Sequence, residues 1–116
     1  MPDFQITKGD TPTFNVAVTQ GGSVFSLVGC SMWFTAKYAY RDLDAAAVFQ
    51  KTIGAGITVT NAALGLATVT LAAIDTSPLA AVKVLLVWDL QVRTAGGKTY
   101  TVSSGNLIVV PDVTLA

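Results

Sequence analysis

Apolar and polar side chains alternate most regularly between positions 84 and 93. The even positions of this stretch, up to 92, are all apolar and include Trp88, whereas positions 89, 91 and 93 carry Asp, Gln and Arg. A period of two is typical of a β-strand that buries one face. The alternation resumes at Tyr100 and Val102, after a short segment with two adjacent glycines. We therefore expect a β-hairpin at the centre of the fold, because its inward face carries large apolar side chains.

Shorter stretches with the same period cover most of the chain. Phe4 and Ile6 share their parity with residues 14, 16 and 18, which predicts two strands, or one strand broken around Gly9. Further strands are expected at 31–38, 48–52, 57–60, 66–71 and 106–110, with a turn at 103–105. A short helical turn capped by Asp75 is expected within 72–79. Seven to nine strands separated by turns predict an all-β antiparallel sandwich with at most one helical turn, as a single domain over 1–116.

The buried face of the strand expected at 31–38 is left open, because Met32, Phe34 and Ala36 compete with Trp33 and Thr35 for the inner face. If Met32, Phe34 and Ala36 face the core, Trp33 points outward and becomes a candidate anchor for a partner. If the odd positions face inward, Trp33 is an ordinary core residue. Asp89 has two interpretations as well. It either contacts solvent or a base such as Lys98, or it is a hydrogen-bonding group at an interface.

Composition narrows the class of partner. The net charge is zero and only 12% of the residues are charged, which argues against nucleic acid as the main partner. Hydrophobic residues make up 52% of the chain, so we expect other subunits to cover part of the surface. The apolar stretch at 79–90 is too short to span a bilayer, and the first residues do not resemble a signal peptide. We expect a protein made in a cytoplasm and not inserted in a membrane.

The inventory of reactive residues favours a protein that is not an enzyme and holds no cofactor. Histidine is absent, which removes the commonest general base and a common zinc ligand. The Gly-Gly-Lys-Thr sequence at 96–99 lacks the upstream glycine of a phosphate-binding loop and precedes a strand, which favours a hairpin turn. Asp42 and Asp44 could help to hold a hard cation, but two solvated carboxylates are favoured. Cys30 is interpreted as a small buried apolar residue, because no histidine can activate it.

A series of short phrases, in order along almost the whole chain, resembles a phage-encoded β-sandwich family, the N-terminal domain of baseplate upper proteins and its small stand-alone relatives. The phrases are Ile6-Thr7-Lys8-Gly9-Asp10-Thr11, Leu27-Val28-Gly29, Trp33-Phe34-Thr35-Ala36-Lys37, Leu71-Ala72-Ala73-Ile74-Asp75-Thr76, Trp88-Asp89-Leu90-Gln91-Val92, Gly97-Lys98-Thr99-Tyr100, Ser104-Gly105-Asn106-Leu107 and Pro111-Asp112-Val113-Thr114.

This resemblance implies an immunoglobulin-like sandwich that is a structural component of a tailed-phage virion and acts by protein–protein contact. We expect a tail, baseplate or adaptor component, present in several copies and in contact with other virion proteins. A capsid decoration or head-fibre-base protein is the alternative. A carbohydrate-binding module for host glycans is a less favoured alternative, based on Trp33, Trp88, Tyr38 and Tyr40 as stacking platforms. The candidate interface residues are Trp33, Tyr38, Tyr40, Asp89, Pro111 and Val113.

Overall fold

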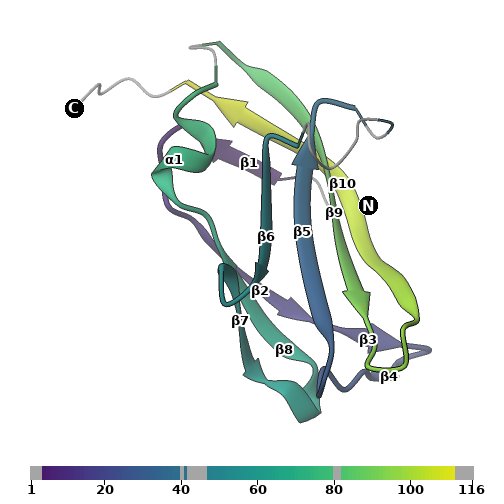
Figure 1. Cartoon of the computed structure of the whole chain (residues 1–116). Coiled ribbons are helices and arrows are strands. Elements are labelled where there is room, and N and C mark those ends of the chain that lie inside the picture. The colour runs from purple at the N-terminus through teal and green to yellow at the C-terminus, as the bar shows by residue number, and fades with distance from the viewer. Residues whose placement is uncertain (1–3, 40, 42–46, 80–81, 112–116) are drawn as a thin grey trace.

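The computed structural model describes residues 4–39, 41, 47–79 and 82–111, which form one curled sheet of eight strands (Figure 1). The strand order is β1-β10-β9-β5-β6-β7-β8-β2, and a separate two-residue ribbon pairs β3 with β4. The strands are β1 (Phe4–Thr7), β2 (Thr13–Ala17), β3 (Thr19–Gln20), β4 (Ser23–Val24), β5 (Ser31–Lys37), β6 (Phe49–Ile53), β7 (Gly56–Asn61), β8 (Leu66–Thr70), β9 (Val84–Arg93) and β10 (Thr99–Val110).

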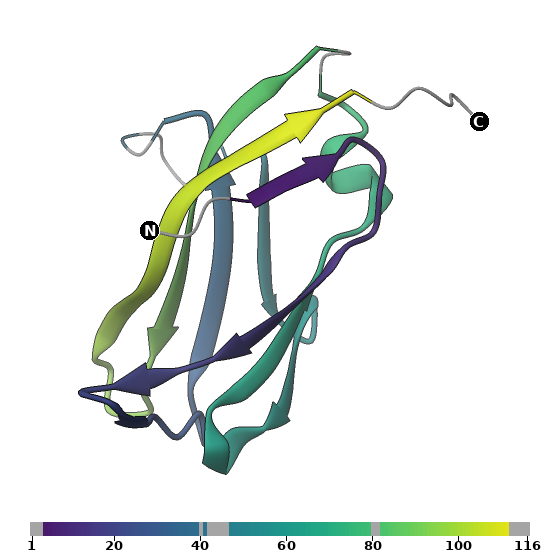
Figure 2. The same ribbon diagram turned by 180° about the vertical axis from the view of Figure 1, so that it is seen from behind.

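The sheet curls so that two layers face each other. One layer contains β1, β10, β9, β5 and β6, and the other contains β7, β8 and β2; only a short parallel pairing of β6 with β7 joins them. Figure 2 shows β1 beside the C-terminal half of β10. After β1 the chain crosses to β2 in the opposite layer. The groups β10-β9-β5 and β2-β8-β7 form the two facing layers of a sandwich. The expected all-β sandwich is confirmed.

The core is built from the alternating positions that the sequence singled out. Along β9 the residues at 86, 88, 90 and 92 are buried, while those between them are partly exposed. The rings of Phe4 and Phe34 lie 5.0 and 5.4 Å from the ring of Trp88. Along β5 the residues Met32, Phe34 and Ala36 belong to the core. The even parity of β5 therefore faces inward, and Trp33 lies on the outer face of the sheet.

Strand β10 corrects the prediction of a turn at 103–105. The strand continues without a turn from Thr99 to Val110, and its pairing with β9 is shifted between Thr101 and Ser103. Val102 is the extra residue of a β-bulge. Before the bulge the even position Tyr100 lies opposite the buried Val92, whereas after it the buried residues are the odd positions 105, 107 and 109. A bulge thus stands where a turn was predicted.

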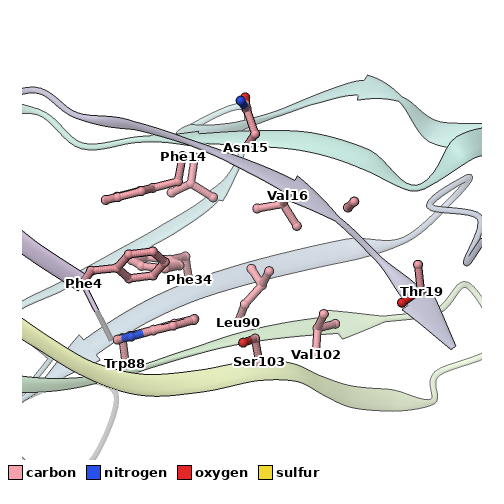
Figure 3. Close-up of a pocket in the computed structure, with 12 residues that line it drawn as sticks. Phe4, Phe14, Asn15, Val16, Thr19, Phe34, Trp88, Leu90, Val102 and Ser103 are labelled. Atoms are coloured by element: carbon pink, nitrogen blue, oxygen red, sulfur yellow. The ribbon is translucent and has the colours of Figure 1, made fainter. Parts of the chain in front are cut away.

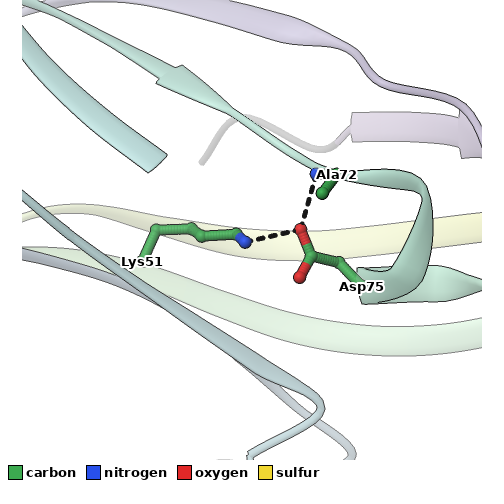
Figure 4. A network of polar contacts seen from close by, with 3 residues as sticks. All are labelled: Lys51, Ala72 and Asp75. Atoms are coloured by element: carbon green, nitrogen blue, oxygen red, sulfur yellow. Dashed lines mark hydrogen bonds and ion pairs between the residues drawn. The ribbon is translucent and has the colours of Figure 1, made fainter. Parts of the chain in front are cut away.

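A helical turn lies within 72–79 as predicted, but it contains Asp75 instead of following it. Helix α1 (Ala73–Thr76) begins two residues before Asp75, whose carboxylate accepts a 2.7 Å hydrogen bond from the backbone N–H of Ala72 (Figure 4). The same oxygen, Oδ2, lies 2.7 Å from Nζ of Lys51 on β6. Asp75 thus lies in the first helical turn, and its side chain caps the backbone N–H of Ala72, which precedes the helix. Its ion pair with Lys51 attaches α1 to the sheet.

Two further features complete the described part of the fold. A second helical element, the 3-10 turn η2 (Ala62–Leu64), connects β7 to β8. Its first backbone donors are partly satisfied by the side chain of Asn61, which accepts from the N–H of Leu64.

No helix in the described part of the chain is long and apolar enough to cross a membrane.

Candidate functional site

The outer face of the layer formed by β10, β9, β5 and β6 brings together the outward side chains of four neighbouring strands. Pairing of β9 with β5 places Asp89 opposite Thr35 and Gln91 opposite Trp33. Pairing of β9 with β10 places Leu85 opposite Ile108 and Arg93 opposite Thr99. Because side chains directly opposite each other on one face are in contact range, the register divides this face into two parts of different chemistry.

The first part, which we call the polar half, is a hollow of about 520 Å³ that opens to solvent. Its side chains combine one aromatic ring with hydroxyl, amide, carboxylate, ammonium and guanidinium groups. The lining residues are Trp33, Thr35, Lys37, Gln50, Asp89, Gln91, Arg93 and Thr99.

Hydrogen bonds between strands fix part of the polar half. Nε2 of Gln50 donates a 3.0 Å bond to Oγ1 of Thr35. Nε2 of Gln91 lies 3.5 Å from both Oδ2 of Asp89 and Oγ1 of Thr101, so this amide bridges β9 and β10 with two long contacts. These contacts hold the two amides against the sheet, on either side of the strand that carries Trp33.

The second part, which we call the apolar half, lies at the other end of the same face. It consists of Leu85, Val87, Ile108 and Val110, whose positions on β9 and β10 point away from the core. Its polar neighbours on the same face are Asn106, opposite Val87, and Gln5 of β1, opposite Ile108. The side chain of Leu85 is 60% exposed, and the other three apolar residues are half-buried. A solvated sheet face carries polar residues at such positions, so the apolar half has the composition of a contact surface.

The structure places the predicted interface residues as follows. Trp33 and Asp89 are half-buried and lie together in the polar half. Tyr38 directly follows β5 and is 59% exposed, and Pro111 is exposed directly after β10. Tyr40 and Val113, like Asp42 and Asp44, lie outside the described residues.

Two strand pairings bear on the proposed contact between Asp89 and Lys98. Thr35 and Ser104 are the register partners of Asp89, whereas Lys98 lies in the turn beyond the Arg93–Thr99 pair. Lys98 is therefore not opposite Asp89 on the sheet.

Sequence analysis missed the apolar half. Its signal is present in the strand pattern, because the outward positions 85 and 87 of β9 are Leu and Val while 89, 91 and 93 are polar. The outward position of Ile108 could not be read from the sequence, since it depends on the change of parity at the bulge.

A second cavity lies between the two layers, where β2 and β10 are not paired. It measures about 300 Å³ and is lined by aromatic and aliphatic side chains, among them Phe4, Phe14, Phe34 and Trp88 (Figure 3). The Nε1 atom of Trp88 is buried and has no hydrogen-bond partner in the described part of the chain. This cavity is an opening into the core, and Asn15, Thr19 and Ser103 add polar groups to its apolar walls.

Neither cavity presents an arrangement typical of a catalytic centre. Cys30 is half-buried and packs against the core, with its Sγ 3.7 Å from the carbonyl oxygen of Ser26. Among residues 4–39, 41, 47–79 and 82–111, no group of three or more Cys, Asp, Glu or His residues is placed to hold a metal ion.

Comparison with known proteins adds no relative. No family model matches the sequence, and no curated protein matches it significantly.

Proposed function

We propose that this chain is a non-enzymatic structural component of a tailed-phage virion, in the tail or baseplate, and that it acts by protein–protein contact. The ordered phrases that resemble the baseplate upper protein family support the phage setting. Two of these phrases meet in the folded chain, because the N–H of Gly9 bonds to Oγ1 of Thr76. The sandwich supplies a stable support, with its binding groups on its surface.

The exposed apolar half of the outer face carries this proposal. Leu85 is 60% exposed and lies beside the half-buried Ile108 on the neighbouring strand, so both can be covered by another protein without a change of fold. Complete burial of such a side chain stabilises by roughly 1.5–3 kcal/mol, which gives a small patch useful binding energy. The partners are neighbouring virion proteins, with further copies of this chain among them.

Sedimentation of the purified chain over a wide concentration range tests self-association. The proposal predicts a mass that rises with concentration, and a monomer for the variant Leu85→Lys, because a charge in a buried apolar contact is costly. The matched control is Val24→Lys, at a position that is 55% exposed on the separate β3–β4 ribbon. A control that dissociates as readily as Leu85→Lys would contradict the assignment to the apolar half.

A further inference from the structure

Trp33 is the only aromatic residue in the lining of the polar half. It is half-buried on the outer face, between Gln91 of β9 and Thr52 of β6. The core does not need its ring, because the inward positions of β5 are already filled by Met32, Phe34 and Ala36. A large aromatic ring therefore lines a hollow that is otherwise polar.

The groups around Trp33 are planar and offer both donors and acceptors. Gln50 and Gln91 carry amides, Asp89 carries a carboxylate, and Arg93 carries a guanidinium group. Side chains of these types bond to pairs of neighbouring hydroxyl groups, since each presents two polar atoms side by side. The hydrogen bonds of Gln50 to Thr35 and of Gln91 to Asp89 and Thr101 restrict their movement before any ligand arrives.

We infer that the polar half is a carbohydrate-binding site that takes a neutral oligosaccharide. A hexose ring has an apolar face of C–H groups, which packs on an indole ring, and an edge of hydroxyl groups, which bonds to amides and carboxylates. The hollow of about 520 Å³ is large enough for more than one sugar unit. Because both signs of charge line it, in Asp89 and in Lys37 and Arg93, a neutral ligand fits better than a strongly charged one.

The site is separate from the contact surface proposed above, although the two share one face. Leu85 and Ile108 form part of the apolar half, whereas Trp33 and Gln91 lie further along β5 and β9. The protein contact and the sugar site can therefore be removed by different substitutions. The failure of one does not imply the failure of the other.

Titration of the full chain with free oligosaccharides tests the inference. The probes are neutral hexasaccharides of glucose, galactose, mannose and N-acetylglucosamine at millimolar concentration, with polygalacturonate as a charged comparison, and calorimetry and NMR shifts as readouts. At least one neutral probe is expected to bind and to shift the indole signal of Trp33. Trp33→Ala is expected to weaken binding about tenfold or more, while Trp33→Phe keeps part of the affinity because a ring remains.

Matched variants decide the outcome. Leu85→Lys is expected to bind the sugar as the wild type does, and unchanged unfolding curves for Trp33→Ala would show that lost binding is not lost folding. The inference is overturned if no neutral probe binds, if only polygalacturonate binds, or if binding survives in Trp33→Ala. Loss of self-association in Trp33→Ala without sugar binding by the wild type would assign the hollow to a protein contact and overturn it as well.

Discussion

The backbone N–H of Gly9 donates a 2.8 Å hydrogen bond to Oγ1 of Thr76, a fully buried side chain 67 positions further along the chain. The bond joins the loop between β1 and β2 to the last residue of α1. Because β1 and β2 belong to different layers, this contact fixes the point at which the chain crosses from one layer to the other.

Thr76→Val should destabilise the fold by about 1–2 kcal/mol, because it keeps the shape of the side chain but removes the acceptor of the Gly9 N–H. Denaturant unfolding measures the loss, and hydrogen exchange should show reduced protection of the Gly9 amide. Thr70→Val is the control: it removes only a solvent-exposed hydrogen bond between the hydroxyls of Thr70 and Thr13, and is expected to change stability by less than about 0.5 kcal/mol. Equal effects of the two substitutions would show that the buried hydrogen bond is not the cause.

The ion pair between Lys51 and Asp75 attaches α1 to β6, and both side chains are largely buried, with exposed fractions of 14% and 10%. Asp75→Ala should cost about 2 kcal/mol, because it leaves the ammonium group of Lys51 and the N–H of Ala72 without their shared acceptor. Unfolding of Lys51→Met, Asp75→Ala and the double variant measures the coupling, expected at about 1 kcal/mol or more. Asp10→Ala, in an exposed loop, is the control and should have little effect.

Gly65 and Gly54 both have positive φ, at 69° and 85°, but they differ in the space available for a Cβ atom. A Cβ atom at Gly65 would lie 2.5 Å from the carbonyl oxygen of Phe25 and 2.7 Å from that of Val18. A Cβ atom at Gly54 would meet nothing within 4 Å. Gly54→Ala should therefore cost only the backbone strain of about 1–2 kcal/mol, and Gly65→Ala clearly more. Thermal unfolding of the two variants gives the comparison, and equal costs would contradict it.

Substitution of the apolar half should affect association and leave the fold intact. Ile108→Lys places a charge beside Leu85 on the outer face, where it does not enter the core. Its unfolding free energy is expected within about 1 kcal/mol of the wild type, while its self-association is reduced by at least tenfold. Light scattering measures the second effect. A variant that unfolds readily would show instead that Ile108 supports the sandwich.

Much of the sandwich could be predicted from the sequence, because alternation fixes which residues of an isolated strand face inward. This worked for β9, where all even positions are apolar and the odd positions 89, 91 and 93 are polar. It did not settle β5, because the large ring of Trp33 competes with the even positions for the core. Burial of Met32, Phe34 and Ala36 and the pairing with β9 show that Trp33 faces outward.

Two other features were beyond sequence reasoning for local reasons. The Ser-Ser-Gly sequence at 103–105 has the composition of a turn, yet the pairing with β9 continues through it, with the bulge at Val102. The start of α1 has no capping side chain at Ala72, and the true cap comes from Asp75 inside the helix. The candidate site depends on the orientation of β5 and on the bulge in β10, because the outward positions of Trp33 and Ile108 define its two halves.

A density map of the particle assembled from the genome that encodes this chain tests the central proposal most directly. The account predicts copies of the chain in the tail or baseplate, with Leu85 and Ile108 buried against a neighbouring protein. A particle that lacks the chain, or one in which the apolar half of every copy faces solvent, would contradict it.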